Sequence, residues 1–119
     1  MHRLDRMRIL VIGAQGQLAM SLRKVLAADD LLALSHQELD ICDGARVYET
    51  VRSLRPDVVI NGAAIRRPDD CEKEPDRAFA VNSLGTRNLA LACAEARCPL
   101  LQVSSDNVFD GRKTSPYLE

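Results

Sequence analysis

The chain has 119 residues and 46% of them are hydrophobic, enough to bury the core of one domain of ordinary size. A formal net charge of −1 and an aromatic content of 3% argue against the basic field and base-stacking side chains of a nucleic-acid-binding module. No apolar run approaches the roughly 18 residues of a membrane-spanning helix, and no signal-peptide pattern precedes the first strand. We therefore expect a cytoplasmic globular domain that binds neither nucleic acid nor a membrane.

Four cysteines, Cys42, Cys71, Cys93 and Cys98, are spread along the chain without a C-x-x-C pair. Two histidines are the only imidazoles that could join them in a metal site. We predict free, reduced thiols, as in cytoplasmic proteins, and no bound metal ion.

The first six residues are a polar stretch that stops at a second methionine, Met7. We expect residues 1–6 to be a disordered extension, with Met7 a candidate natural start. Residues 7–119 should then form the folded domain.

A short apolar, β-branched run at residues 8–12 is typical of a buried parallel strand. Gly13, Gly16 and Ala19 follow it at the spacing G-x-x-G-x-x-A. A helix should come next, because four apolar residues recur on one helical face. These residues are Leu18, Leu22, Val25 and Leu26.

Strand, glycine turn and helix in this order are the context that a dinucleotide-binding turn requires. Gly13 allows the tight turn, and Gly16 lets the backbone come close to a pyrophosphate. The helix N-terminus offers unpaired N–H groups to the phosphate charge, and Ala19 keeps the helix close to the strand. The alternative is a tight strand–helix turn without a ligand.

The rest of the chain continues the alternation of strands and helices. Asp43 should cap a helix, Pro56 should end it, and Pro75 should lie near the start of a long one. We predict strands at 31–34, 38–41, 57–61 and 100–104, helices at 44–54 and 75–97, a charged loop at 65–74 and a polar tail at 110–119.

This alternation predicts an α/β fold, a Rossmann-like doubly wound parallel sheet with strand order 3-2-1-4-5. Ligands of such sheets bind beyond the carboxyl ends of the strands, where the order reverses. Ser35 and His36 follow the second strand, where NAD-selective sites carry an acid for the ribose 2′-OH. Neither residue is acidic, so the choice between NAD and NADP stays open.

Four segments together resemble one group of enzymes: residues 13–18, 56–64, 81–89 and 104–111. The chain resembles the extended short-chain dehydrogenase/reductases, and within them the dTDP-4-dehydrorhamnose reductase family. The resemblance spans nearly all of residues 7–119. It implies NAD(P)H-dependent reduction of a 4-keto nucleotide sugar, in deoxysugar or polysaccharide synthesis.

The resemblance also implies roles for individual residues. In the cofactor site, Asp40 and Ile41 would contact adenine, and Asn82 would hold the nicotinamide side of the pocket, unless Asn82 is a purely structural hydrogen-bonding residue. The hydroxyl of Ser105 would polarise the substrate carbonyl, or else cap the strand end. The remaining cofactor-binding residues would be Gly13, Gln15, Gly16, Gln17 and Leu18 at the pyrophosphate, Ala63 and Ala64 at the ribose, and Ser104 at the same edge.

Two departures from the family matter for catalysis. The family's general acid is the tyrosine of a Tyr-x-x-x-Lys pair, which in family members lies beyond the position that matches Glu119. Tyr117 is followed by two residues and matches an earlier Pro-Tyr-x-Glu stretch instead. Asn107 also stands where a tyrosine usually contacts substrate. We therefore expect a partial NAD(P)-binding domain that is inactive alone.

Arg66 and Arg67 lie in the charged loop and could grip a substrate diphosphate, or could simply be solvated. Residues 66–69 and Asn107 are also similar to the regulatory β subunit of methionine adenosyltransferase, which makes a nucleotide-binding regulatory subunit the alternative function. A folded remnant without a ligand is a third possibility. In the reductase family the strand at 100–104 has a further neighbour, so we expect this open edge to form a homo-oligomer.

Overall fold

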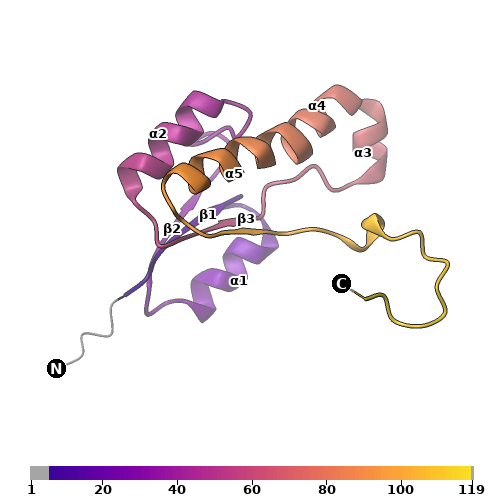
Figure 1. Cartoon of the computed structure of the whole chain (residues 1–119), viewed down its shortest axis with the longest axis horizontal. Helices are drawn as coiled ribbons and strands as arrows, with labels where there is room; N and C mark the ends of the chain where they lie inside the picture. The colour runs from indigo at the N-terminus through magenta and orange to yellow at the C-terminus, as the bar shows by residue number, and fades with distance from the viewer. Residues whose placement is uncertain (1–5, 119) are drawn as a thin grey trace.

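Four parallel strands form one sheet in the computed structural model, which describes residues 6–118 (Figure 1). The strands lie in the order β2-β1-β3-β4. Their bounds are Arg8–Ile12 for β1, Asp30–Leu34 for β2, Val58–Asn61 for β3 and Leu100–Gln102 for β4. The α/β class and the doubly wound parallel sheet predicted from the sequence are confirmed.

Strand β1 lies at the centre because nearly all of its side chains are apolar and can be buried on both faces. Leu10 and Ile12 point into one core, and Ile9 and Val11 point into the other. The parallel register places Ile9 between residues of both neighbouring strands. Because β1 is buried on both faces, the glycine turn that follows it is held at the carboxyl edge of the sheet.

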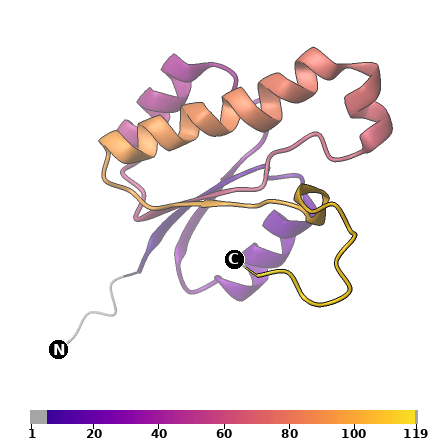
Figure 2. The ribbon, with the colours of Figure 1, turned by 45° about the vertical axis from the view of Figure 1, so that its right-hand side comes forward.

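Helices cover both faces of the sheet (Figures 1 and 2). Helix α1, Gln17–Val25, lies on one face and packs through Ala19 and Leu22, and Leu26, just after its end, joins the same core. Helices α2, Gly44–Leu54, and α5, Thr86–Glu95, lie together on the other face. The predicted apolar face of α1 is wrong at Val25, which is 79% exposed.

The strand predicted at residues 38–41 is wrong, because the backbone turns there. The N–H groups of Glu38 and Leu39 both donate to the carbonyl of Ser35. Leu39 and Ile41 are nevertheless buried in the core. The alternation of apolar and polar residues at 38–41 therefore indicates which side chains are buried, and not a strand. Without this third strand, the predicted order 3-2-1-4-5 becomes 2-1-4-5. The four strands that form lie in that order, as β2-β1-β3-β4.

Strand β4 ends at Gln102, two residues before the end of the predicted strand at 100–104. Two helical regions also differ from the sequence prediction. The loop predicted at 65–74 contains helix α3, Pro68–Lys73, which begins with a proline and has two acidic residues in its first turn. The long helix predicted at 75–97 consists of α4, Pro75–Phe79, a π-helical turn, Ala80–Gly85, and α5.

The two ends of the described chain are held differently. Near the start, Arg6 donates a hydrogen bond from Nε to the carbonyl of Ala28 at 2.8 Å, while residues 1–5 of the predicted extension lie outside the described part. After β4 comes a 3₁₀ turn, Asp106–Val108, and then an exposed tail that closes on itself by stacking Phe109 on Tyr117. Among residues 6–118, no helix is long and apolar enough to cross a membrane.

Candidate functional site

The glycine turn lies at the carboxyl end of β1, between the ends of β2 and β3. The N–H groups of Gly13 and Ala14 both donate to the carbonyl of Leu34, each at 3.0 Å. Gly13 has a φ of +93°, and an added Cβ would lie 3.1 Å from the backbone of Gly62 and Ala63. This position therefore requires glycine, both for its conformation and for the close approach of β3.

Helix α1 begins beside this turn without the usual side-chain cap. Gly16 is its N-cap residue, no side chain of the described residues caps it, and its first turn carries no acid. By contrast, the Asp43 carboxylate caps α2 by accepting from the N–H of Arg46 at 3.1 Å. The first N–H groups of α1 are thus left for an external anion, which the helix dipole also favours.

The loop after β3 is ordered by a buried amide, that of Asn61, which has no exposed surface. Its Oδ1 accepts from the N–H of Ala63 at 3.0 Å, and its Nδ2 donates to Oε1 of Gln102 on β4 at 2.8 Å. Asn61 thereby fixes the turn that follows β3. Asn61 is not among the site residues predicted from the sequence, although an asparagine that ends a buried apolar strand is a recognisable signal.

A second amide, Asn82 on the π-helical turn, holds the same loop one step further on. Its Nδ2 donates to the carbonyl of Ile65 at 2.9 Å, and its Oδ1 accepts from the N–H of Ile65 at 2.8 Å. The thiol of Cys71 adds a weaker hydrogen bond to that carbonyl at 3.3 Å. Both polar atoms of Asn82 are thus engaged with the backbone, the structural role that the sequence left as its alternative.

At the end of β2, a side chain also forms a hydrogen bond with the backbone of a loop. Ser35 donates from its N–H to Oε2 of Glu38 at 2.7 Å. This bond, the Ser35 hydroxyl and the nearby Arg23 guanidinium hold the pKa of the Glu38 carboxyl below its ordinary value. Glu38 is therefore ionised at neutral pH.

These loops enclose a cleft of about 280 Å³ at the carboxyl edge of the sheet. The glycine turn forms one wall, the end of β2 a second and the loop after β3 a third. Nine predicted site residues line it: Gly13, Gln15, Gly16, Gln17, Leu18, Ile41, Ala63, Ala64 and Arg66. Other lining residues include Ser35, His36, Leu39, Ile65, Arg77 and Val81. Arg77 was missed by the sequence analysis, because it was placed inside a long helix with no ligand-facing signal.

The other predicted residues lie outside the lining of this cleft. Asp40 uses Oδ1 to accept from the N–H of Cys42 at 2.9 Å, and Arg67 is an exposed residue paired with Asp70 at 3.9 Å. Oγ of Ser105 accepts from the N–H of Asn107 at 3.3 Å and so caps the 3₁₀ turn. Ser104 is exposed just beyond β4. Their roles toward cofactor or substrate stay predictions.

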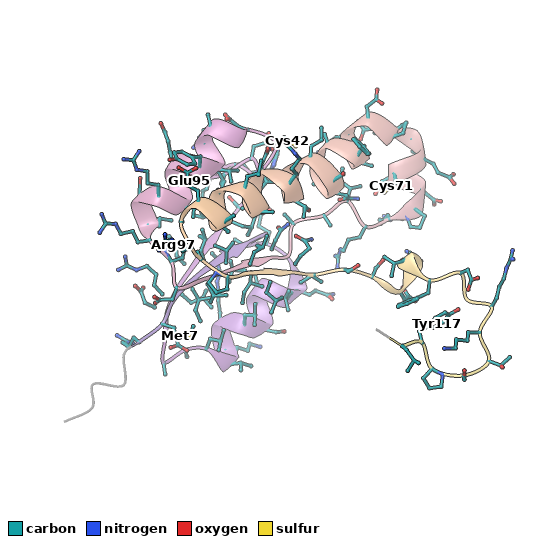
Figure 3. The ribbon with its side chains drawn as sticks, in the orientation of Figure 1. Met7, Cys42, Cys71, Glu95, Arg97 and Tyr117 are labelled. Atoms are coloured by element: carbon teal, nitrogen blue, oxygen red, sulfur yellow. The ribbon has the colours of Figure 1, made fainter. Side chains whose placement is uncertain are left out.

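A larger hollow, of about 560 Å³, lies between α2 and α5. Its polar lining residues are Tyr48, Arg52, Arg55 and Glu95, and its lining includes no glycine turn or helix N-terminus. The smaller cleft is the better candidate because the uncapped N-terminus of α1 forms part of its wall. Among the described residues, no group of three or more metal-ligating side chains forms, and all four cysteines are free (Figure 3 labels Cys42 and Cys71).

Comparison with known proteins matches this architecture to one family. The family described as "RmlD substrate binding domain" matches residues 7–119. The dTDP-4-dehydrorhamnose reductases of Aggregatibacter actinomycetemcomitans and Streptomyces griseus are 41% and 45% identical over 94% and 96% of this chain. The chain belongs to the dTDP-4-dehydrorhamnose reductase family. A reductase of this family from Bacillus anthracis, crystallised with NADP, superimposes with a TM-score of 0.90 at 32% identity over 95% of this chain.

The match covers nearly all of this chain but a smaller share of each relative. It spans 39% of the Aggregatibacter reductase, 38% of the Streptomyces reductase and 41% of the Bacillus anthracis reductase. The chain thus spans about two fifths of the length of these family members. The shared part contains the whole cleft built by the glycine turn and the ends of β2 and β3.

Proposed function

We propose that this chain binds NADP(H) or NAD(H) in the cleft, as the cofactor-binding part of a reductase of 4-keto nucleotide sugars. The observation that carries the proposal is the uncapped N-terminus of α1 beside the Gly13 turn. Its free N–H groups suit a pyrophosphate, and Gly16 places no side chain between them and the phosphate. When bound, the cofactor would supply the hydride for carbonyl reduction.

The residues of the cleft divide into regions that suit the parts of such a cofactor. The turn from Gly13 to Leu18 would hold the pyrophosphate, and Ile41 with Asp40 would flank the adenine. Ala63 and Ala64 would lie against the ribose. Asn82 lies outside the cleft lining and would support the site by holding Ile65, which lines it. Ser104 would lie at the same edge of the site.

The substrate would approach from the end of β4 and the loop after β3. Ser105 would polarise the carbonyl of a 4-keto nucleotide sugar, and Asn107 would lie near the sugar. Arg66, which lines the cleft, and Arg67, which is largely exposed, would attract the diphosphate.

Calorimetric titration of the 119-residue chain with NADP⁺ and NAD⁺ tests the proposal. We expect binding of at least one dinucleotide, and Gly16→Val should weaken it at least tenfold because the branched side chain blocks the phosphate path. Ala45→Val, which adds bulk at an exposed position of α2, is the matched control. Equal binding by the Gly16→Val and Ala45→Val variants would place the nucleotide elsewhere.

We further propose that these 119 residues do not turn over substrate by themselves. The chain has two tyrosines, and neither lines the cleft. Tyr48 donates its hydroxyl to Glu95, and Tyr117 donates its hydroxyl to Asp110 in the tail, away from the sheet (Figure 3). Neither phenol therefore serves as the general acid. Oxidation of NADPH by the purified chain with a dTDP-4-keto sugar would contradict this.

The second candidate function is a nucleotide-binding regulatory subunit that resembles the β subunit of methionine adenosyltransferase. The observation in its favour is Arg66, which begins the Arg-Arg-Pro-Asp segment and lines the cleft. Co-purification of the chain with a larger synthase would support this function, whereas dinucleotide binding alone is compatible with both.

We also propose that the chain associates with itself in the cytoplasm. Within residues 6–118, strand β4 pairs with β3 on one side and has no strand on the other. Leu101 on this strand is 53% exposed, and Val103 beyond it is also exposed. An open, apolar edge is a template for another strand, which a second copy of the chain could supply. The four free thiols suit a reducing compartment.

A further inference from the structure

The last residues of β3 and β4 are joined by their side-chain amides. The parallel register aligns Asn61 with Gln102, so both side chains lie on the same face of the sheet. Nδ2 of the buried Asn61 donates to Oε1 of Gln102 at 2.8 Å, and Nε2 of Gln102 donates to the carbonyl of Val103 at 3.0 Å. Gln102 therefore uses both ends of its amide.

Val103, the first residue after β4, is held through both of its backbone polar groups. Its N–H donates to the backbone carbonyl of Asn61 at 3.2 Å, and its carbonyl accepts from the Gln102 amide. Within residues 6–118, β4 has no neighbouring strand on its outer side that could hold this segment. The backbone that leads from Val103 to Ser104 and Ser105 is thus positioned from β3.

The other end of this amide pair reaches the wall of the cleft. Oδ1 of Asn61 accepts from the N–H of Ala63 at 3.0 Å, and Ala63 lines the cleft together with Ala64. An unbroken series of hydrogen bonds therefore runs from Ala63 through Asn61 and Gln102 to Val103. Hydrogen bonds in such a series polarise and strengthen one another, so a change at one end alters the bonds at the other.

We propose that Gln102 is a positioning residue that couples occupation of the cleft at Ala63 to the ordering of residues 103–105. The inference rests on the proposed dinucleotide binding and adds to it the connection by which the cofactor side orders the substrate side, where Ser105 lies. Gln102 itself touches neither ligand and acts through Asn61 and Val103. A dinucleotide that lies against Ala63 holds the Asn61 amide in one orientation, which restricts Gln102 and, through it, Val103.

A purely structural role for Gln102 predicts something different. In that role the amide only satisfies Nδ2 of the buried Asn61 and stabilises the end of β4. The segment after β4 would then be equally ordered with the cleft empty or occupied, and loss of Gln102 would loosen it to the same degree in both states. The effect of a dinucleotide on the order of Val103 therefore separates the two roles.

Amide hydrogen exchange of the full 119-residue chain tests the proposal, followed residue by residue by NMR with and without saturating NADP⁺ or NAD⁺. Bound dinucleotide should slow exchange at residues 16–18 and should slow exchange of the Val103 N–H roughly threefold. Gln102→Glu keeps an oxygen that accepts from Asn61, so that the buried amide stays satisfied, and removes the donor to Val103. This variant should keep the slowing at 16–18 and lose most of the slowing at Val103. Gln37→Glu, at an exposed position after β2, makes the same change in net charge and should behave like the unmodified chain.

The outcomes separate this inference from the proposed function. Slowing at Val103 that is present in the unmodified chain and in Gln37→Glu but is lost in Gln102→Glu supports the role of Gln102. Slowing at 16–18 without slowing at Val103 in the unmodified chain overturns that role and leaves dinucleotide binding intact, and so does equal slowing at Val103 in Gln102→Glu. Absence of slowing at both places, with either dinucleotide, overturns the proposed function and this inference together.

Discussion

Asn82 and Ile65 are joined by a pair of hydrogen bonds in which one side-chain amide satisfies both backbone polar groups of a single loop residue. The amide reaches the loop from a π-helical turn, and the hydroxyl of Thr86 donates to the Asn82 carbonyl at 3.1 Å. Such turns break the regular α-helical ladder and are frequent at functional sites. Here the turn connects α4 and α5 and supports the wall of the cleft from behind.

Asn82→Ala should therefore lower both stability and dinucleotide affinity. Loss of two hydrogen bonds to a half-buried backbone is expected to cost about 1–2 kcal/mol in the free energy of unfolding. The loosened loop should also weaken NADP⁺ binding several-fold. Urea unfolding and calorimetric titration measure the two effects, and Ser53→Ala, at an exposed position of α2, is the control. Stability and affinity equal to those of the unmodified chain would show that the pair does not support the site.

Gly85 allows the π-helical turn to lie close to Ile41. A Cβ at position 85 would come within 2.6 Å of the buried Ile41 side chain. Gly85→Ala should therefore destabilise the chain by about 1–3 kcal/mol through overpacking. Thermal and urea unfolding measure the loss, with Ser83→Ala in the same turn as the control. Adding Ile41→Val removes one of the two clashing atoms, so the double variant should recover part of the loss; no recovery would assign the cost to another cause.

The pH dependence of stability should carry a contribution from Cys93. Burial, with a smaller effect from Cys98, raises the pKa of the Cys93 thiol to about 11 from its ordinary value of 9.0. The folded state therefore holds this proton more tightly than the unfolded state. The stability that it contributes is fully present below pH 9 and is lost as the pH rises from about 9 to 11.

Urea unfolding between pH 8 and pH 11 tests this sign. The unmodified chain should lose more stability over this range than Cys93→Ala, by up to about 1.4 kcal/mol for each pH unit between the two pKa values. The comparison concerns the slope, so the constant cost of the smaller side chain cancels. Parallel pH profiles for the two proteins would show that the thiol is not held in its protonated form.

The sequence predicted the fold class and much of the cleft because both depend on strong local signals. The apolar run of β1 and the spacing of Gly13 and Gly16 are such signals, and they place the turn at the correct edge. The predicted strand at 38–41 failed because its acidic side chains bond to nearby backbone. Glu38 bonds Ser35 and Asp40 bonds Cys42, which offers the chain a turn in place of a strand.

The partners of the side-chain amides that support the cleft could not be predicted, because they lie far away in the chain. Asn61 reaches Gln102 across 41 positions, and Asn88 on α5 donates to the carbonyl of Ile41 across 47. Side-chain amides of this kind carry no periodicity. The π-helical turn is equally hidden, because its sequence continues the small and apolar pattern of the helices on either side.

The open edge of β4 leads to the last prediction, which concerns association. Leu101 is aligned with Ile60 of β3 and is 53% exposed, so the sheet presents an apolar edge residue on the described surface. If a second copy pairs there, burial of Leu101 would stabilise the dimer and a charge at this position would oppose it. Leu101→Lys should therefore shift a dimer or larger assembly toward monomer, measured by light scattering at micromolar concentration. Val25→Lys places the same charge at an exposed apolar position of α1 and should leave the assembly unchanged. A monodisperse monomer for the unmodified chain would contradict the prediction, because it would show that the unpaired edge of β4 does not cause association.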